Sequence, residues 1–102
     1  MRERKYRKID SEGYPIHEIF EEGVLIGYRV QRPDWEFDGD SYSGTREILV
    51  ESAGEDAPGI FKLIDEGYKG FNSSQPEIRI VSGETVWERA RERALELAKI
   101  RR

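Results

Sequence analysis

The C-terminal quarter constrains the fold most, because a short strand pattern there is followed directly by a long helical one. Residues 77–81 form a short strand-forming run, Glu-Ile-Arg-Ile-Val, and from residue 85 onward apolar side chains recur every third or fourth position. This spacing places a single apolar stripe on one side of a helix. The stripe consists of Val86, Trp87, Ala90, Ala94, Leu97 and Ala98. We therefore predict a strand and then a long helix that docks through this stripe.

The start of this helix has two candidate caps. Thr85 followed by Glu88 forms a capping box, which favours a start at Thr85. Ser82 is the alternative, because Val81 and Val86 would then flank the cap as a hydrophobic staple. The face opposite the stripe mixes acidic and basic side chains, which predicts a solvated surface and not a basic helix that recognises nucleic acid.

Two strands and a turn precede the middle of the chain. Residues 16–20 and 24–32 are rich in β-branched and aromatic side chains, and a turn signal at 21–23 separates them, so they predict a hairpin. Residues 45–51 predict a third strand, with Ile48 and Val50 on one face. Charged residues at alternate strand positions predict that one face of the sheet is partly exposed to water. These residues are Arg29, Glu47 and Arg79.

A short helix is predicted over residues 57–66. Asp56 would cap it, Pro58 would lie in its first turn, and Gly67 would follow its end. The predicted element order is then β-β-β-α-β-α. This order indicates an α+β fold, in which a mostly antiparallel sheet of about four strands is packed by the short helix and the long C-terminal helix.

The chain divides, by composition, into a basic N-terminal arm at 1–13 and a single α+β domain at 14–102. The 102 residues carry a net charge of −4, and basic side chains concentrate at both ends of an acidic body. No apolar run is long enough for a membrane span, and no signal-peptide pattern is present, so we expect a cytoplasmic protein without membrane contact. Abundant charged residues without cysteine are typical of thermophilic proteins.

An acidic and aromatic stretch at 34–44 is the strongest candidate for a partner-binding surface. Aromatic side chains within polar turn sequence either pack back on their own domain or contact a partner. The partner-binding candidates are Trp35, Phe37 and Tyr42 from this stretch, with Tyr68 and Phe71 from a later loop. The surrounding acidic residues favour a protein partner over nucleic acid.

Two other kinds of binding site remain as alternatives. Clustered carboxylates are suitable ligands for a hard divalent cation, and they would come from Asp34, Glu36, Asp38 and Asp40. The stretch is not an EF-hand, because its twelfth position is Thr45 and not glutamate. The second alternative is association with nucleic acid, through contacts of the basic termini with phosphates. They would involve Arg2, Arg4, Lys5, Arg7 and Lys8.

Catalysis has little support in the sequence. Cysteine is absent, which excludes thiol nucleophiles, and His17 is the only histidine. No pattern indicates a cofactor, and whether the chain is an enzyme stays open, with the balance against it. We therefore expect a small soluble protein-interaction or accessory module without catalytic activity. Homodimerisation, through an exposed sheet edge or the helix stripe, is compatible with this expectation.

Overall fold

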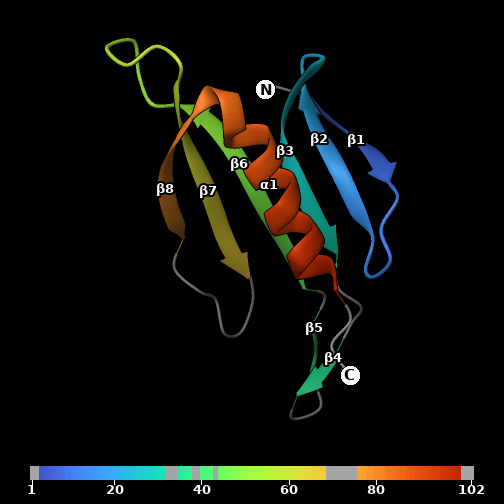
Figure 1. The fold of residues 1–102 in the computed structure, drawn as a ribbon. Coiled ribbons are helices and arrows are strands. Elements are labelled where there is room, and N and C mark those ends of the chain that lie inside the picture. The colour runs from blue at the N-terminus through green and yellow to red at the C-terminus, as the bar shows by residue number, and fades with distance from the viewer. Residues whose placement is uncertain (1–2, 32–34, 38–39, 43, 69–75, 100–102) are drawn as a thin grey trace.

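The computed structural model describes residues 3–31, 35–37, 40–42, 44–68 and 76–99. Six strands form one sheet, two short strands form a separate ribbon, and one helix lies across a single face of the sheet (Figure 1). The elements in chain order are β1 Arg4–Ile9, β2 Ile16–Glu21, β3 Val24–Gln31, β4 Trp35–Phe37, β5 Asp40–Tyr42, β6 Thr45–Ser52, β7 Ile60–Tyr68, β8 Glu77–Ser82 and α1 Gly83–Ala98.

The main sheet is an antiparallel meander with the strand order β1-β2-β3-β6-β7-β8. The predicted hairpin is the β2–β3 pair, and the predicted third strand is β6. The β4–β5 ribbon is inserted between β3 and β6 and extends beyond one end of the main sheet (Figure 1). β1 and β8 are therefore the two edge strands, and they lie at opposite sides of the molecule.

The predicted short helix at 57–66 is wrong, because this region forms a turn and the strand β7. Gly59 has φ 80°, which is a left-handed conformation incompatible with a helix, and the Ile60 amide donates to the Ala57 carbonyl at 3.1 Å. The Pro58-Gly59 pair thus closes a β-turn. The apolar residues of 60–64 fit the period of a helix and also that of a strand. In the strand, Leu63 faces α1 and Ile64 faces the other side of the sheet.

The predicted number of strands is also wrong, since the sheet has six strands and one covering helix. Besides β7, the missed strand is β1, which comes from the segment interpreted as a basic arm. Its sequence Arg-Lys-Tyr-Arg-Lys-Ile lacks the apolar alternation of a half-buried strand. It pairs with β2 along its whole length, from Arg4 opposite Glu21 to Ile9 opposite Ile16.

The main core lies between the sheet and α1. Its most deeply buried side chains include Ile16, Ile48 and Val86, each with no exposed surface. The predicted helix stripe faces the sheet, and its alanines Ala90 and Ala94 are fully buried. Small side chains at these positions let the helix backbone lie close to β3 and β6. The remaining core residues are Tyr28, Val30, Val50, Leu63, Val81, Leu97 and Ala98.

The helix begins one turn earlier than the preferred capping box predicts. Ser82 is the N-cap residue, although its side chain makes no capping hydrogen bond, and α1 begins at Gly83. The Gly83 amide donates to the Gly59 carbonyl at 2.7 Å, so the β6–β7 turn satisfies one of the free amides at the helix start. At the other end, the Ala98 carbonyl accepts from the Tyr14 amide at 2.7 Å.

Candidate functional site

The edge strand β8 turns its isoleucines away from the core. The β7 register places Arg79 opposite Leu63 and Val81 opposite Phe61, on the side covered by α1. Ile78 and Ile80 must then face the opposite side, where they are 57% and 64% exposed. Large apolar side chains this exposed on a regular strand indicate a contact surface. The predicted grouping of Arg79 with Arg29 and Glu47 is wrong, because Arg79 lies on the α1 side.

The uncovered face of the sheet carries one apolar row that crosses all six strands, which we call the far-face row. It follows directly from the register, in which each member lies opposite the next one. Its members, from β1 to β8, are Tyr6, Ile19, Gly27, Leu49, Ile64 and Ile78. Ile19 is fully buried and Leu49 is 8% exposed, whereas Ile78 is mostly exposed. Burial is thus greatest in the middle of the row and falls toward both ends, since Tyr6 on β1 is 44% exposed.

Long side chains from β1 and β3 lie over the part of the far-face row that runs from β1 to β6. The Arg4 guanidinium donates to Glu21 on β2 at 3.1 Å and to Glu47 on β6 at 3.1 and 3.2 Å, so it reaches over the row. Hydrogen bonds to Tyr6, Glu21 and Glu47 raise the pKa of Arg4. The Arg29 guanidinium lies 5.4 Å from the centre of the Tyr6 ring. The most exposed large apolar side chains among the described residues are those of Val24, Ile78 and Ile80, and the last two lie together on β8.

The two edges of the sheet differ in how well they are protected against pairing. Four of the six β1 residues are lysine or arginine, and such charges discourage a second strand of the same kind from pairing with it. β8 carries one acidic and one basic side chain, Glu77 and Arg79, together with three apolar residues. β8 is therefore the edge more suited to accept another strand.

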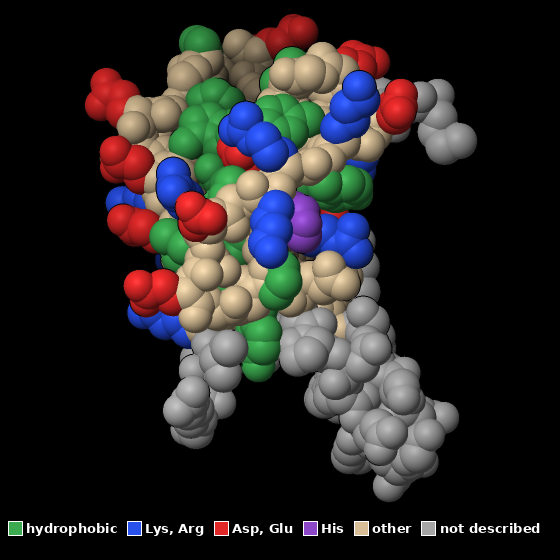
Figure 2. Space-filling view, turned by 90° about the vertical axis from the view of Figure 1, so that its right-hand side faces the viewer, with side chains coloured by type: hydrophobic (Ala, Val, Ile, Leu, Met, Phe, Trp, Pro, Cys, Tyr) green, Lys and Arg blue, Asp and Glu red, His purple; other side chains and the backbone are tan. Residues whose placement is uncertain are grey.

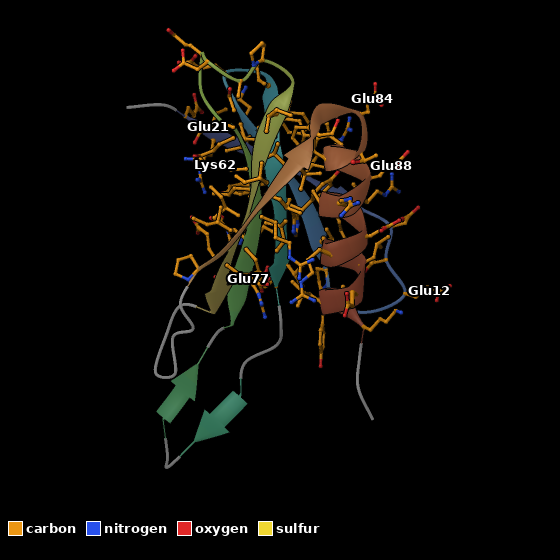
Figure 3. The ribbon with its side chains drawn as sticks, turned by 60° about the vertical axis from the view of Figure 1, so that its left-hand side comes forward. Glu12, Glu21, Lys62, Glu77, Glu84 and Glu88 are labelled. Carbon is orange, nitrogen blue, oxygen red and sulfur yellow. The ribbon has the colours of Figure 1, made fainter. Side chains whose placement is uncertain are left out.

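A groove runs between β8 and α1 on the covered side of the sheet, with a volume of about 630 Å³. Figure 3 shows β8 and α1 side by side, with Lys62 and Glu21 on the opposite side of the sheet. The floor of the groove is apolar and consists of Ile48, Leu63 and Val81. Its walls are charged. The sheet contributes Asp65, Glu77 and Arg79 to these walls. The helix contributes the uncharged Thr85 and the charged residues Glu88, Arg89, Glu92, Arg93 and Glu96.

Asp65 fixes one end of this groove through a charged network. Its carboxylate is buried and accepts two hydrogen bonds of 2.7 Å from Arg46, together with one of 3.3 Å from Arg93 on α1. Arg93 also forms an ion pair with Glu96 at 3.3 Å. The network ties β6, β7 and α1 together at this end of the groove.

The predicted partner-binding aromatics fall partly outside the described residues. Trp35 and Phe37 belong to β4 and Tyr42 to β5, with Trp35 opposite Tyr42 and Phe37 opposite Asp40. Residues two apart on a strand share a face, so the register places these three positions on one face of the ribbon. Tyr68 is the last residue of β7, far along the chain from β4 and β5, and Phe71 lies outside the described residues.

The predicted basic residues lie along the β1 edge. Figure 2 shows lysine and arginine side chains around the single histidine on this side of the molecule. Arg7 forms an ion pair with Glu18 at 2.6 Å, and Arg4 forms those with Glu21 and Glu47, so carboxylates already neutralise two of the predicted phosphate contacts. Lys5 and Lys8 are exposed, and Arg2 lies outside the described residues.

The predicted carboxylate cluster is described only in part. Asp34 and Asp38 lie outside the described residues, while Glu36 is opposite Ser41 and Asp40 is opposite Phe37. The register therefore does not place Glu36 and Asp40 opposite each other. Across the part of the chain that the structure describes, no three histidine or acidic side chains are grouped as a metal site requires.

Sequence reasoning did not find the β8 edge or the groove. The signal for the edge was present, because strand 77–81 has two isoleucines on one face and two charges on the other. Which face meets the helix depends on the pairing with β7.

No protein-family model, curated protein or solved structure matches this chain significantly. Within the described residues, α1 is too short and too polar to cross a membrane.

Proposed function

We propose that this protein is a non-catalytic protein-interaction module that accepts an extended polypeptide segment along β8. The observation that carries the proposal is the orientation of β8, an edge strand among the described strands, with Ile78 and Ile80 exposed on the face away from α1. An edge strand offers main-chain amides and carbonyls in a row, which an added strand can satisfy.

The two faces beside β8 give such a segment different surroundings. Side chains on one face of the added strand would contact Ile78 and Ile80, so we expect apolar residues there. Side chains on the other face would lie beside the groove, whose walls carry both acidic and basic groups above an apolar floor. We therefore expect bound segments to alternate apolar residues with polar or charged ones.

A binding selection tests this proposal directly. A displayed library of random peptides would be selected against the wild-type protein, and the selected peptides measured against the Ile78→Lys/Ile80→Lys variant. The variant keeps the fold, because both side chains are exposed. Val24→Lys is the matched control, since Val24 is 62% exposed but lies on β3.

The proposal predicts peptides of alternating pattern that bind the wild type and the Val24→Lys control but lose at least tenfold in affinity for the double variant. Such a loss corresponds to about 1.4 kcal/mol, a modest value for two desolvated apolar contacts. Peptides that bind all three proteins equally, or a selection that yields none, would contradict it.

The β4–β5 ribbon is a second contact surface that we propose for the same module. Its support is the register that places the positions of Trp35, Phe37 and Tyr42 on one face of a ribbon that extends beyond the main sheet (Figure 1). A two-stranded ribbon is only marginally stable by itself, so a partner would stabilise it. Trp35→Ala/Phe37→Ala should weaken binding of a selected partner, and unchanged affinity would remove the ribbon from the proposal.

A further inference from the structure

We infer that the polypeptide segment that pairs with β8 is β8 of a second copy of this chain, in an antiparallel arrangement about a two-fold axis. This inference rests on the proposed function, because it identifies the partner of the same edge. It adds a specific pairing register, which follows from the charges and apolar residues of the strand itself.

The two charges of β8, which form an ion pair of 3.3 Å within one copy, favour one register over the neighbouring one. If Ile78 lies opposite Ile78 of the partner subunit, then Glu77 lies opposite Arg79 of the partner subunit, and the reverse pair forms across the axis. Opposite charges on facing strand positions are favourable. In the register centred on Arg79, that residue would face the partner's Arg79, which is unfavourable. The β8 sequence is therefore self-complementary in one register and self-repelling in the neighbouring one.

The same register joins the far-face rows of the two copies. Each row ends at Ile78, so pairing of Ile78 with the partner's Ile78 makes one apolar row that crosses twelve strands without a break. The exposed surface of Ile78 would then be buried on the two-fold axis, where contacts contribute most to association, and Ile80 would lie opposite Pro76 of the partner subunit.

The other face and the other edge are consistent with this assembly. Because the joined sheet is continuous, both helices lie on its same side and the two grooves meet beside the pairs of Glu77 with the partner's Arg79. The β1 edge does not compete, since its Lys5 and Lys8 would face like charges of another β1 strand. One edge is thus available for pairing, so association stops at two copies.

A charge-exchange experiment tests the register. Arg79→Glu alone leaves only acidic side chains at the two facing positions, and Glu77→Arg alone leaves only basic ones. Both residues are exposed, with side chains 69% and 58% accessible, so neither change disturbs the core. When the two variants are mixed, every facing position again pairs an acidic with a basic side chain.

The assay is sedimentation velocity of the full chain across about a hundredfold range of concentration. We expect the wild type to dimerise, each single variant and Ile78→Lys/Ile80→Lys to lose at least tenfold in dimer affinity, and the mixture to recover it. Val24→Lys should behave as the wild type. A wild type that is monomeric throughout, or a dimer insensitive to these changes, would overturn the inference.

Other outcomes separate this inference from the proposed function. A monomeric wild type that still binds selected peptides through Ile78 and Ile80 would overturn the second copy as partner while leaving the β8 edge as a docking site. A dimer lost in Ile78→Lys/Ile80→Lys but unaffected by the charge variants would overturn the register. A wild type that neither selects peptides nor dimerises would overturn the two proposals together.

Discussion

Replacing Asp65 by alanine should destabilise the protein strongly, because this carboxylate joins three elements. Asp65 is 7% exposed and accepts two hydrogen bonds of 2.7 Å from Arg46, whose side chain is only 16% exposed. The change would remove the carboxylate that faces this mostly buried guanidinium. Removing one partner of a buried ion pair typically costs about 3–5 kcal/mol.

The contacts of Asp65 set the expected magnitude near the lower end of this range. Arg93 contributes less than Arg46, because its bond is 3.3 Å long and its side chain is 35% exposed, so solvent screens the pair. We expect a loss of about 3 kcal/mol for Asp65→Ala. Asp65→Asn should lose less, since the amide keeps the size of the side chain and one acceptor oxygen.

Urea unfolding followed by circular dichroism measures this loss. With a typical urea dependence of 1–3 kcal/mol per molar, a loss of about 3 kcal/mol lowers the midpoint by roughly 1–3 M. Glu96→Ala is the matched control, because its pair with Arg93 is exposed and worth only a few tenths of a kcal/mol. A loss for Asp65→Ala as small as that of the control would refute this reasoning.

Three further changes test the packing. Gly27→Ala places a Cβ against the Ile48 carbonyl and the Leu49 side chain, so β3 and β6 must separate. We expect a loss of about 1–3 kcal/mol in the free energy of unfolding, and an unchanged thermal midpoint would contradict this. Ala90→Leu overfills the contact between helix and sheet and should cost a similar amount in urea unfolding. Burial, with a smaller contribution from Glu18, raises the pKa of Tyr28. As the pH rises, Tyr28 therefore loses its proton at a lower pH in the unfolded chain than in the folded protein. The free energy of unfolding should then fall above about pH 10. Tyr28→Phe should reduce this fall, and identical pH profiles for the two proteins would contradict it.

The helix and four strands could be predicted from local pattern alone. The α1 stripe has a clear period of 3.6, and its predicted members are the ones that meet the sheet or, like Trp87, pack beside it. The β2–β3 hairpin is similarly local, because a turn signal separates two runs of strand-forming residues. Such short-range signals need no knowledge of the rest of the chain.

Two other strands could not be predicted because their local signals point elsewhere. The segment 57–66 has every mark of a helix start, yet Pro58 and Gly59 form a turn, and the following residues alternate between the face covered by α1 and the uncovered face of the sheet. β1 is polar because it lies at an edge, where pairing with β2 and ion pairs replace burial. In both cases tertiary contacts override local preference.

The candidate site at β8 could not be predicted from the sequence for a related reason. The charged face of α1 is exposed as predicted, but part of it also forms a wall of the groove, because the helix crosses the sheet beside β8. The orientation of Ile78 and Ile80 depends on the β7–β8 register, and a shift of one residue would reverse it. Sequence patterns identify which residues share a face but not which face is covered.

Residue-resolved amide hydrogen exchange tests the central claim, that β8 pairs with β8 of a second copy, most directly. The wild-type protein would be compared at low and high concentration, with β1 serving as the internal control edge in the same sample. We predict that amides of β8 that point away from β7 exchange more slowly at high concentration, while amides of β1 do not change. Exchange at β8 that is independent of concentration, or protection that develops at β1 instead, would contradict the account.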